Sequence, residues 1–260
     1  MRVALAVTTS AQPREALTAR AREAARRWAV PFLPRRAKEG IATWFEERVE
    51  ALFIFGHDGV VLWDGQGHHG FHVGLAHLRR MRLAAGESDT FVRVAQLAPG
   101  DAVLDCTLGL AQDALVASLA VGPGGRVVGV EKSLGLYALA SEGLKDFEQG
   151  PDSCRVEVVH AEAGEYLRTL PSRSFEVVCF DPMFARPQKA QPGFDVLRRF
   201  AEHAPLTREV LEEGRRVARR WVVVKGSRYS DDLRKLGLTP EPGSRYSEVA
   251  WGRVGPSAAP

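Results

Sequence analysis

The sequence has few cysteines and no long hydrophobic run. No apolar stretch approaches the roughly 20 residues that a membrane-spanning helix needs, and the opening MRVALAVTTS becomes polar too soon for a secretory signal peptide. We therefore expect a cytoplasmic protein with no membrane partner. The three cysteines, Cys106, Cys154 and Cys179, lie far apart and form no CxxC pair. This spacing argues against a disulfide framework and against a zinc knuckle.

Characteristic metal-ligand spacing and internal repeats are also missing. Four histidines gather between His68 and His77, but their spacing is not that of a known metal site, so we expect no bound metal. No low-complexity segment occurs. With 260 residues, of which 45% are hydrophobic, the chain can bury a core. The length favours one large domain with a smaller one attached.

Charge is unevenly distributed along the chain. The net charge is only +3, yet residues 14–36 hold seven Arg against two Glu, and residues 186–228 hold eleven Arg or Lys against five Asp or Glu. Arginine suits bidentate contacts with phosphate, so these windows favour a nucleic-acid partner. The alternative is that they are solvated helix faces that bind nothing.

Residues 1–80 predict a small N-terminal α+β domain. VALAV at residues 3–7 favours a strand, and residues 14–30 favour a helix rich in Ala and Arg. ALFIF and VVLWD favour two further strands, and the four residues from Gly56 to Gly59 between them are typical of a hairpin. A connection rich in glycine and histidine, GQGHHGFHVG, follows.

Residues 81–260 predict a second domain, in which Ser88 is the expected N-cap of the first helix. AVLDC, RVVGVE, VEVVH, FEVVCF and WVVVKG are short, apolar and rich in valine, with helical stretches between them. Such strands need both faces covered, which indicates an α/β, Rossmann-like, doubly wound and mostly parallel sheet. Ligands of such sheets bind beyond the carboxyl ends of the strands. Candidate functional residues should therefore follow a strand directly.

The first two strands of this domain end in residues that suit a nucleoside cofactor. Asp105 lies at the end of the first strand, before a turn that contains Gly109. A tight glycine turn lets the backbone approach a ligand closely. The second strand ends at Glu131, 22 residues after Gly109. In dinucleotide-type folds an acidic residue at this position binds the ribose hydroxyls. The GxGxxG pattern is missing, however, and a single glycine can serve plain turn chemistry.

The strand FEVVCF is followed by Asp181, Pro182, Met183 and Phe184. An exocyclic amine of a nucleobase is a poor nucleophile, because its lone pair is delocalised into the ring. A carboxylate and the proline carbonyl can accept its N–H groups and orient the nitrogen, while an aromatic ring stacks on the base. Asp181, Pro182 and Phe184 are therefore candidate catalytic residues. The alternative is a simple turn at Asp181 with Phe184 in the core.

The order of these motifs resembles that of the class I S-adenosylmethionine-dependent methyltransferases. More narrowly, DCTLGLAQDALVAS, DPMF before a basic stretch, and VVVKGSRY followed by SRYSEVAWG resemble the RsmJ-type guanine-N2 methyltransferases of small-subunit ribosomal RNA, over residues 74–254. The chain departs from that family at Ala111, where a glycine is expected, and at Gln112, where Arg is common. The resemblance implies S-adenosyl-L-methionine as cofactor. The cofactor-binding residues that it implies are Asp105, Thr107, Gly109, Gln112, Asp113, Glu131, Lys132, Glu162, Ala163 and Asp181.

The resemblance also implies an RNA partner, from the small ribosomal subunit. The target base must be unpaired or flipped out of its helix to enter such a pocket, and basic residues around it would hold phosphates. The candidates are Arg186, Lys189, Arg198, Arg199, Lys225 and Arg228. Two alternatives stay open. The acceptor could be another RNA or DNA amine, or the fold could carry a nucleotide-binding oxidoreductase or a non-catalytic module, because this architecture hosts many chemistries.

Overall fold

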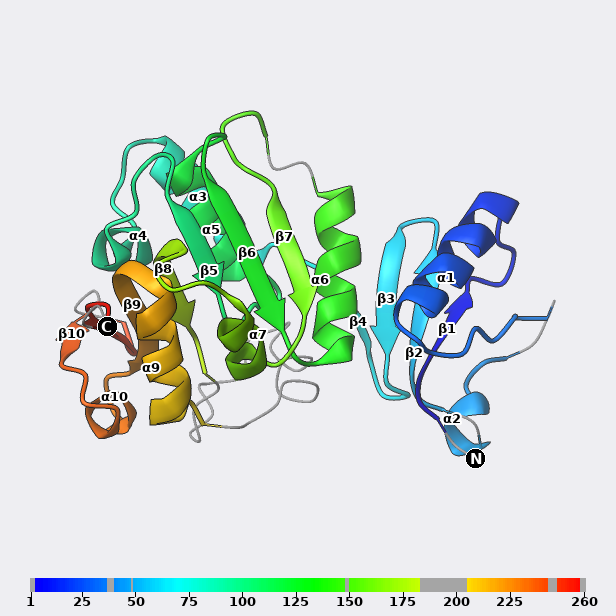
Figure 1. Cartoon of the computed structure of the whole chain (residues 1–260). Helices are drawn as coiled ribbons and strands as arrows, with labels where there is room; N and C mark the ends of the chain where they lie inside the picture. Colours follow the sequence, from blue (N-terminus) through cyan, green and yellow to red (C-terminus); the bar gives the residue numbers. More distant parts are fainter. Residues whose placement is uncertain are drawn as a thin grey trace. The chain divides into compact units, whose positions relative to one another are not determined.

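The computed structural model describes residues 3–36, 40–47, 49–147, 150–182, 205–242 and 247–257. The chain forms two compact units, which we describe separately (Figure 1). The first unit comprises residues 1–72 and 138–147, and the second comprises residues 73–137 and 148–260. The first unit ends before the predicted boundary at residue 80, because helix α3 (Gly74–Ala84) packs against α5 (Gln112–Val121) of the second unit. No helix in the described ranges is long and apolar enough to cross a membrane.

The first unit contains a four-stranded sheet with the order β1-β2-β3-β4. Its strands are β1 (Val3–Thr9), β2 (Val49–Gly56), β3 (Gly59–Trp63) and β4 (His68–Gly70). β1 and β2 are parallel, and the other neighbours are antiparallel. The predicted hairpin is confirmed, since Gly56 pairs with Gly59. The glycine- and histidine-rich connection supplies β4, which local preference does not indicate because glycine is depleted in strands.

Both faces of β2 are buried. Helix α1 (Glu15–Arg27) packs on β1 and β2, and Trp28, just after the helix, contacts Phe53 with 4.9 Å between the centroids of the tilted rings. On β2 the alternate residues Leu52 and Ile54 join a cluster with Trp44 of α2 (Trp44–Glu47). The predicted helix 14–30 is shorter in the structure, because Ala29 adopts a left-handed φ of 53° and turns the chain.

The second unit contains a seven-stranded sheet with the order β10-β11-β9-β8-β5-β6-β7. β5 to β9 are mutually parallel, β11 is antiparallel to β9, and β10 is antiparallel to β11. The predicted Rossmann-like, mostly parallel sheet is thus confirmed. The strands are β5 (Ala102–Asp105), β6 (Arg126–Glu131), β7 (Val156–His160), β8 (Phe175–Phe180), β9 (Ala218–Ser227), β10 (Pro240–Pro242) and β11 (Val249–Val254).

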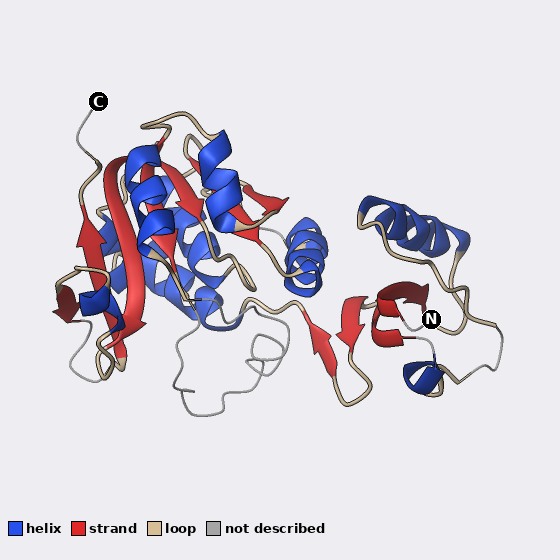
Figure 2. Cartoon of the chain, turned by 60° about the horizontal axis from the view of Figure 1, so that its bottom comes forward, coloured by secondary structure: helices blue, strands red, loops and turns tan. Residues whose placement is uncertain are grey.

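Helices cover both faces of this sheet (Figure 2). α3, α4 (Thr90–Ala95) and α5 lie on one face, and α7 (Ala163–Thr169) and α9 (Arg208–Val217) lie on the other. The chain also forms α6 (Leu134–Asp146) and α10 (Asp232–Lys235). The N-cap of α4 is Asp89 and not the predicted Ser88: its carboxylate accepts the N–H groups of Phe91 and Val92.

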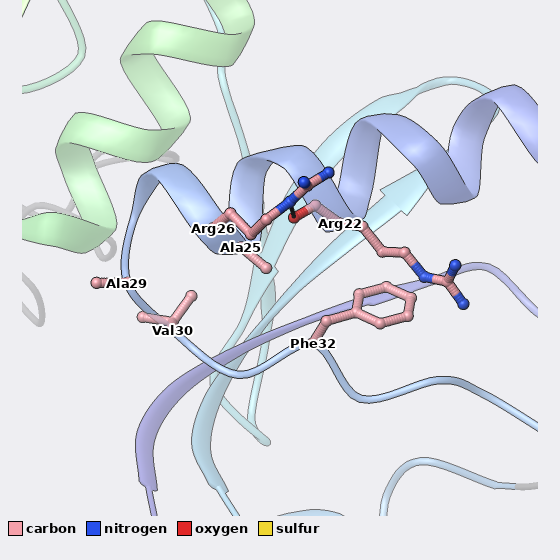
Figure 3. Close-up of a pocket in the computed structure, with 6 residues that line it drawn as sticks. All are labelled: Arg22, Ala25, Arg26, Ala29, Val30 and Phe32. Atoms are coloured by element: carbon pink, nitrogen blue, oxygen red, sulfur yellow. Dashed lines mark hydrogen bonds between the residues drawn. The ribbon is translucent and has the colours of Figure 1, made fainter.

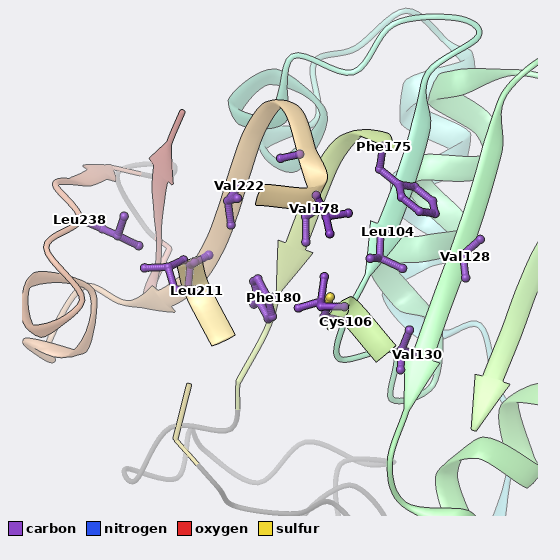
Figure 4. Packing of buried hydrophobic residues seen from close by; sticks show 14 of the residues in the cluster. Leu104, Cys106, Val128, Val130, Phe175, Val178, Phe180, Leu211, Val222 and Leu238 are labelled. Atoms are coloured by element: carbon purple, nitrogen blue, oxygen red, sulfur yellow. The ribbon is translucent and has the colours of Figure 1, made fainter. Parts of the chain in front are cut away.

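The hydrophobic core between the sheet and helices α7 and α9 determines where the polar side chains point (Figure 4). Leu104, Val130, Phe180 and Val224 all belong to this core. Successive side chains along a strand point to opposite faces. Each of these four residues is followed directly by a charged one, so the charged side chains share the opposite face. Those residues are Asp105, Glu131, Asp181 and Lys225.

Candidate active site

The candidate site lies where the direction of strand addition reverses. β5 has β6 on one side and β8 on the other. The strands that follow β5 in sequence, β6 and β7, lie on one side of it, and the later strands, β8 to β11, lie on the other. Open α/β sheets bind ligands beyond the carboxyl ends of the strands at this switch point. Asp105 ends β5, and Asp181 directly follows β8. The fold therefore brings these two predicted residues to the same place.

Thr107 connects these two strand ends. Its backbone N–H donates to the Asp105 carboxylate over 3.0 Å. Its hydroxyl accepts the backbone N–H of Asp181 over 2.6 Å. Thr107 therefore fixes the start of the Asp181-Pro182 turn relative to β5.

The glycine turn after β5 is held against the end of β6. Gly109 has a φ of 53° and donates its N–H to Glu131 over 2.9 Å, and Ser133 donates its N–H to the other Glu131 oxygen over 2.8 Å. Gly129 allows this approach, because an added Cβ would lie 2.3 Å from a methyl carbon of Leu108. Burial raises the pKa of Glu131, and the two backbone N–H groups oppose that rise.

Two departures from the resembled family have structural explanations. Ala111 is fully buried at the N-cap of α5 with φ 60° and ψ 24°, a left-handed conformation that favours glycine. Alanine adopts it at a cost of roughly 1 kcal/mol. Gln112 accepts the backbone N–H of Ala76 over 2.9 Å, and so links α5 to the first turn of α3.

A chain of ion pairs crosses the site. The Lys225 ammonium lies 2.6 Å from the Asp181 carboxylate and 3.1 Å from that of Asp113. Arg79 lies 2.5 Å from the other Asp113 oxygen and forms a two-fold contact with Asp89. Burial opposes ionisation of Asp113, but Lys225 and Arg79 prevail and lower its pKa to about 2. Asp113 is therefore a carboxylate at neutral pH.

Asp105 is the exception in this network. Burial raises its pKa to about 7; the Thr107 N–H and the charge of Lys225 oppose the rise, and the negative charges of Asp113 and Asp181 add to it. No cation among the described residues pairs with Asp105. The site thus holds a buried carboxyl group whose charge a cationic ligand would compensate.

The remaining predicted residues differ in placement. Glu162 caps α7 by accepting the N–H of Glu165 over 2.8 Å, and Ala163 begins that helix. Lys132 is exposed, and its carbonyl oxygen contacts the His160 ring over 3.0 Å. Pro182 lies in the described part of the chain. The predicted residues Phe184, Arg186, Lys189, Arg198 and Arg199 lie outside the described residues.

Two predicted phosphate contacts are engaged within the protein. Lys225 is paired with carboxylates as described above, and Arg228 donates to the Ser247 carbonyl over 3.1 Å. Sequence reasoning missed Arg79, whose partners lie elsewhere in the chain. It also missed Tyr229, which is 67% exposed with the Arg228 guanidinium 6.0 Å from its ring centroid. A lone tyrosine in a turn gives no signal in one sequence.

Comparison with known proteins identifies the family. The model of the family described as "Putative SAM-dependent methyltransferase" matches residues 69–241. The chain belongs to this family. The protein is an S-adenosylmethionine-dependent methyltransferase, and S-adenosyl-L-methionine is its cofactor.

Two relatives extend the comparison. The methyltransferase is 34% identical over 238 residues to "Uncharacterized protein YpiP" of Bacillus subtilis (strain 168), a match that covers 89% of this chain and 92% of the relative. It is also similar to the crystal structure of the SAM-dependent methyltransferase NGO1261 from Neisseria gonorrhoeae. That match has a TM-score of 0.67 at 17% identity and covers 98% of this chain and 97% of the other. At this identity the second likeness shows the shared fold.

The residues of the methyltransferase fit this cofactor. S-adenosylmethionine carries an amino group and a ribose with two hydroxyls, and the site offers an uncompensated buried carboxyl at Asp105 and a second buried carboxylate at Glu131. We expect Asp105 to hold the amino group and Glu131 the ribose hydroxyls. Because Gly109 has no side chain, the turn between them would let the backbone approach the ligand closely.

Proposed function

We propose that this methyltransferase modifies an exocyclic amine of a nucleobase, and that the acceptor is guanine N2 in small-subunit ribosomal RNA. The observation that carries the proposal is the position of Asp181 and Pro182 at the carboxyl end of β8, on the switch point. The choice of guanine in ribosomal RNA is supported by the resemblance of DPMF and VVVKGSRY to the RsmJ-type enzymes.

Asp181 has the properties that the reaction needs. Burial raises its pKa and the charge of Asp113 adds to this, but Lys225 lies against the carboxylate and favours its ionised form. Lys225 donates to Oδ2 of Asp181, and no described residue forms a hydrogen bond with Oδ1. Oδ1 would accept an N–H of the base amine, and the Pro182 carbonyl would accept the second. These two acceptors orient the nitrogen lone pair.

When bound, S-adenosylmethionine supplies an electrophilic methyl group on its sulfonium. After transfer the nitrogen carries one proton too many, and the Asp181 carboxylate that holds the amine would accept it. Thr107 and Lys225 hold Asp181 from two sides. The enzyme thus contributes position and charge, and no covalent intermediate with a protein side chain is needed.

Tyr229 supports a nucleic-acid acceptor. It lies four residues after Lys225, beyond the carboxyl end of β9, which is the strand next to β8. An exposed aromatic ring with an arginine beside it is a stacking surface for an unpaired base. Tyr229 would bind a base that flanks the target.

The test begins with the cofactor and then turns to the acceptor. Calorimetric titration with S-adenosylhomocysteine is expected to show micromolar binding that Glu131→Ala weakens at least tenfold. Methyl transfer from labelled S-adenosylmethionine is then compared for small-subunit ribosomal RNA, large-subunit ribosomal RNA and single-stranded DNA. Asp181→Ala is expected to lower transfer roughly 10²- to 10³-fold, a larger loss than that of cofactor affinity, to which the resemblance also assigns Asp181.

Digestion of the labelled RNA to nucleosides identifies the acceptor. Label in N2-methylguanosine supports the proposal. Label in a methylated adenine or cytosine, or preferred methylation of DNA, would replace guanine with that base and redefine the substrate. Cofactor binding without transfer to any nucleic acid would overturn the proposal.

A further inference from the structure

Helix α1 of the first unit divides its arginines between two environments. Arg20 and Arg27 point to Glu142, whose side chain is only 2% exposed, at 2.9 and 3.3 Å. Arg20 also contacts Asp146 over 3.0 Å. The charges of these two arginines are compensated inside the unit, so they serve the structure.

Arg22 and Arg26 are different, because their charges face solvent. They lie four residues apart and are therefore neighbours on the helix surface. Arg26 pairs with Glu23 over 3.2 Å, but both side chains are more than half exposed, and such pairs contribute little. In the described part of the chain no carboxylate pairs with Arg22. The arginine charges of α1 that no buried carboxylate compensates are thus those of Arg22 and Arg26.

Both arginines line a pocket with an apolar floor, which Figure 3 shows. The pocket has a volume of about 430 Å³, and its other lining residues are Ala25, Ala29, Val30 and Phe32. The Arg22 guanidinium lies over the Phe32 ring, 5.4 Å from its centroid.

The aromatic side of the pocket is fixed by the backbone. Ala29 turns the chain at the end of α1 with its left-handed φ of 53°. The following segment pairs with β1: Val7 donates its N–H to Pro31 over 2.9 Å and accepts that of Leu33 over 2.8 Å. Phe32, between these two bonds, is bridged to Val7 at the sheet edge. The ring is therefore held under the helix by the sheet.

We infer that this pocket binds one nucleotide of single-stranded RNA: the base stacks on Phe32, where it displaces the Arg22 guanidinium that now lies over the ring, and the phosphate binds between Arg22 and Arg26. An aromatic ring and an apolar floor suit the planar face of a base. Two guanidinium groups suit a phosphate. The volume lies in the range of small-ligand pockets. The inference rests on the proposed function, and assigns to the first unit an RNA contact separate from the residues that perform methyl transfer.

The test measures binding of a fluorescein-labelled single-stranded RNA to the full chain by anisotropy, at several salt concentrations. Arg22→Ala with Arg26→Ala is expected to weaken binding at least tenfold and to make the salt dependence shallower by about 0.7 per lost phosphate contact. Phe32→Leu keeps an apolar side chain and is expected to weaken binding roughly five- to 100-fold, with the salt dependence unchanged.

The matched control is Arg155→Ala with Arg234→Ala, which removes the same charge from exposed positions of the second unit. Equal losses in the pocket variant and in this control would overturn the inference. So would displacement of the RNA by a polyglutamate peptide that is equally effective with the wild type and with Phe32→Leu, because the site would then bind polyanions without recognising a base.

The outcome is separable from that of the proposed function. If the wild type neither binds nor methylates RNA, the proposed function fails. If the wild type binds and methylates RNA but the pocket variants match the control, only the pocket inference fails. The expected result is a raised KM for RNA in both pocket variants, with kcat and S-adenosylhomocysteine affinity retained.

Discussion

Two clusters of buried charge, one in each unit, differ in their balance of acids and bases. In the cluster of the first unit one buried carboxylate, that of Glu142, has three cationic neighbours: Arg20, Arg27 and Lys145. Burial opposes its ionisation, but Lys145 and Arg20 prevail and lower the pKa of Glu142. Its charge is therefore compensated more than once.

The second unit has the opposite balance. In its cluster two cations, Lys225 and Arg79, form ion pairs with Asp181, Asp113 and Asp89. Asp105, which lies beside this cluster, forms no ion pair with a cation among the described residues. Burial leaves its pKa raised to about 7. In the first cluster every charge is compensated within the protein, so the cluster stabilises the packing of its elements. In the second cluster one carboxyl group lacks a cation, so a cationic ligand can bind there.

Removing the lysine from each cluster should show the largest difference. Lys225→Met leaves Asp113 and Asp181 without their shared cation, and breaking a buried pair in this way costs roughly 3 kcal/mol or more. Lys145→Met is the matched control and should cost about 1 kcal/mol or less, because Lys145 is 45% exposed and two arginines remain. Denaturant unfolding without cofactor measures both. Equal losses would show that the clusters are energetically alike.

The pH dependence of stability should isolate Asp105. Its folded-state pKa of about 7 lies above the ordinary 3.8, so the folded protein retains a proton that the unfolded chain releases. Its contribution to stability therefore falls as pH rises from about 4 to 7, by at most about 1.4 kcal/mol per pH unit, and is constant above that.

Asp105→Asn removes this titration. The free energy of unfolding of the variant relative to wild type, measured between pH 5 and 8, is expected to rise with pH and level off near pH 7. Asp113, whose pKa is lowered to about 2, titrates outside this window and cancels. A difference that is independent of pH would contradict the assignment.

Glu142→Gln tests the structural role of the balanced cluster. The variant keeps the side-chain volume but removes the charge that its neighbours bind, and a loss of about 2 kcal/mol is expected at pH 7. Because the pKa of Glu142 is lowered, this loss should shrink as the pH falls below its ordinary value of 4.5. Methyl transfer at a temperature where the variant is folded should be unchanged. A loss of cofactor affinity would assign Glu142 a functional role.

The smallest expected effect is that of Ala111→Gly. Glycine relieves the left-handed backbone at φ 60° but adds freedom to the unfolded chain, so a stabilisation of about 1 kcal/mol or less is expected. Ala114→Gly, within the same helix, is the control and should cost about 1 kcal/mol. Thermal unfolding compares the two. Destabilisation of similar size at both positions would show that Ala111 is not strained.

Most of the fold follows from local patterns. The five valine-rich runs occur as strands, and their parallel arrangement follows from the helices between them. β4 and the N-cap of α4 were not predicted correctly, because pairing with β3 and the direction of a side chain decided them. The positions of Asp105, Glu131 and Asp181 at strand ends were available from the sequence, since alternation and the edge of a strand are local properties.

The sequence by itself therefore determined which residues stand at the carboxyl edge of the sheet, and which side of it they face. Only the tertiary structure decided their charges. Lys225 reaches Asp113 across 112 positions of sequence and Asp181 across 44, through the register of β8 with β9. Ionisation depends on burial and on the distance between charges, and both arise only when strands and helices that are distant in sequence are packed together.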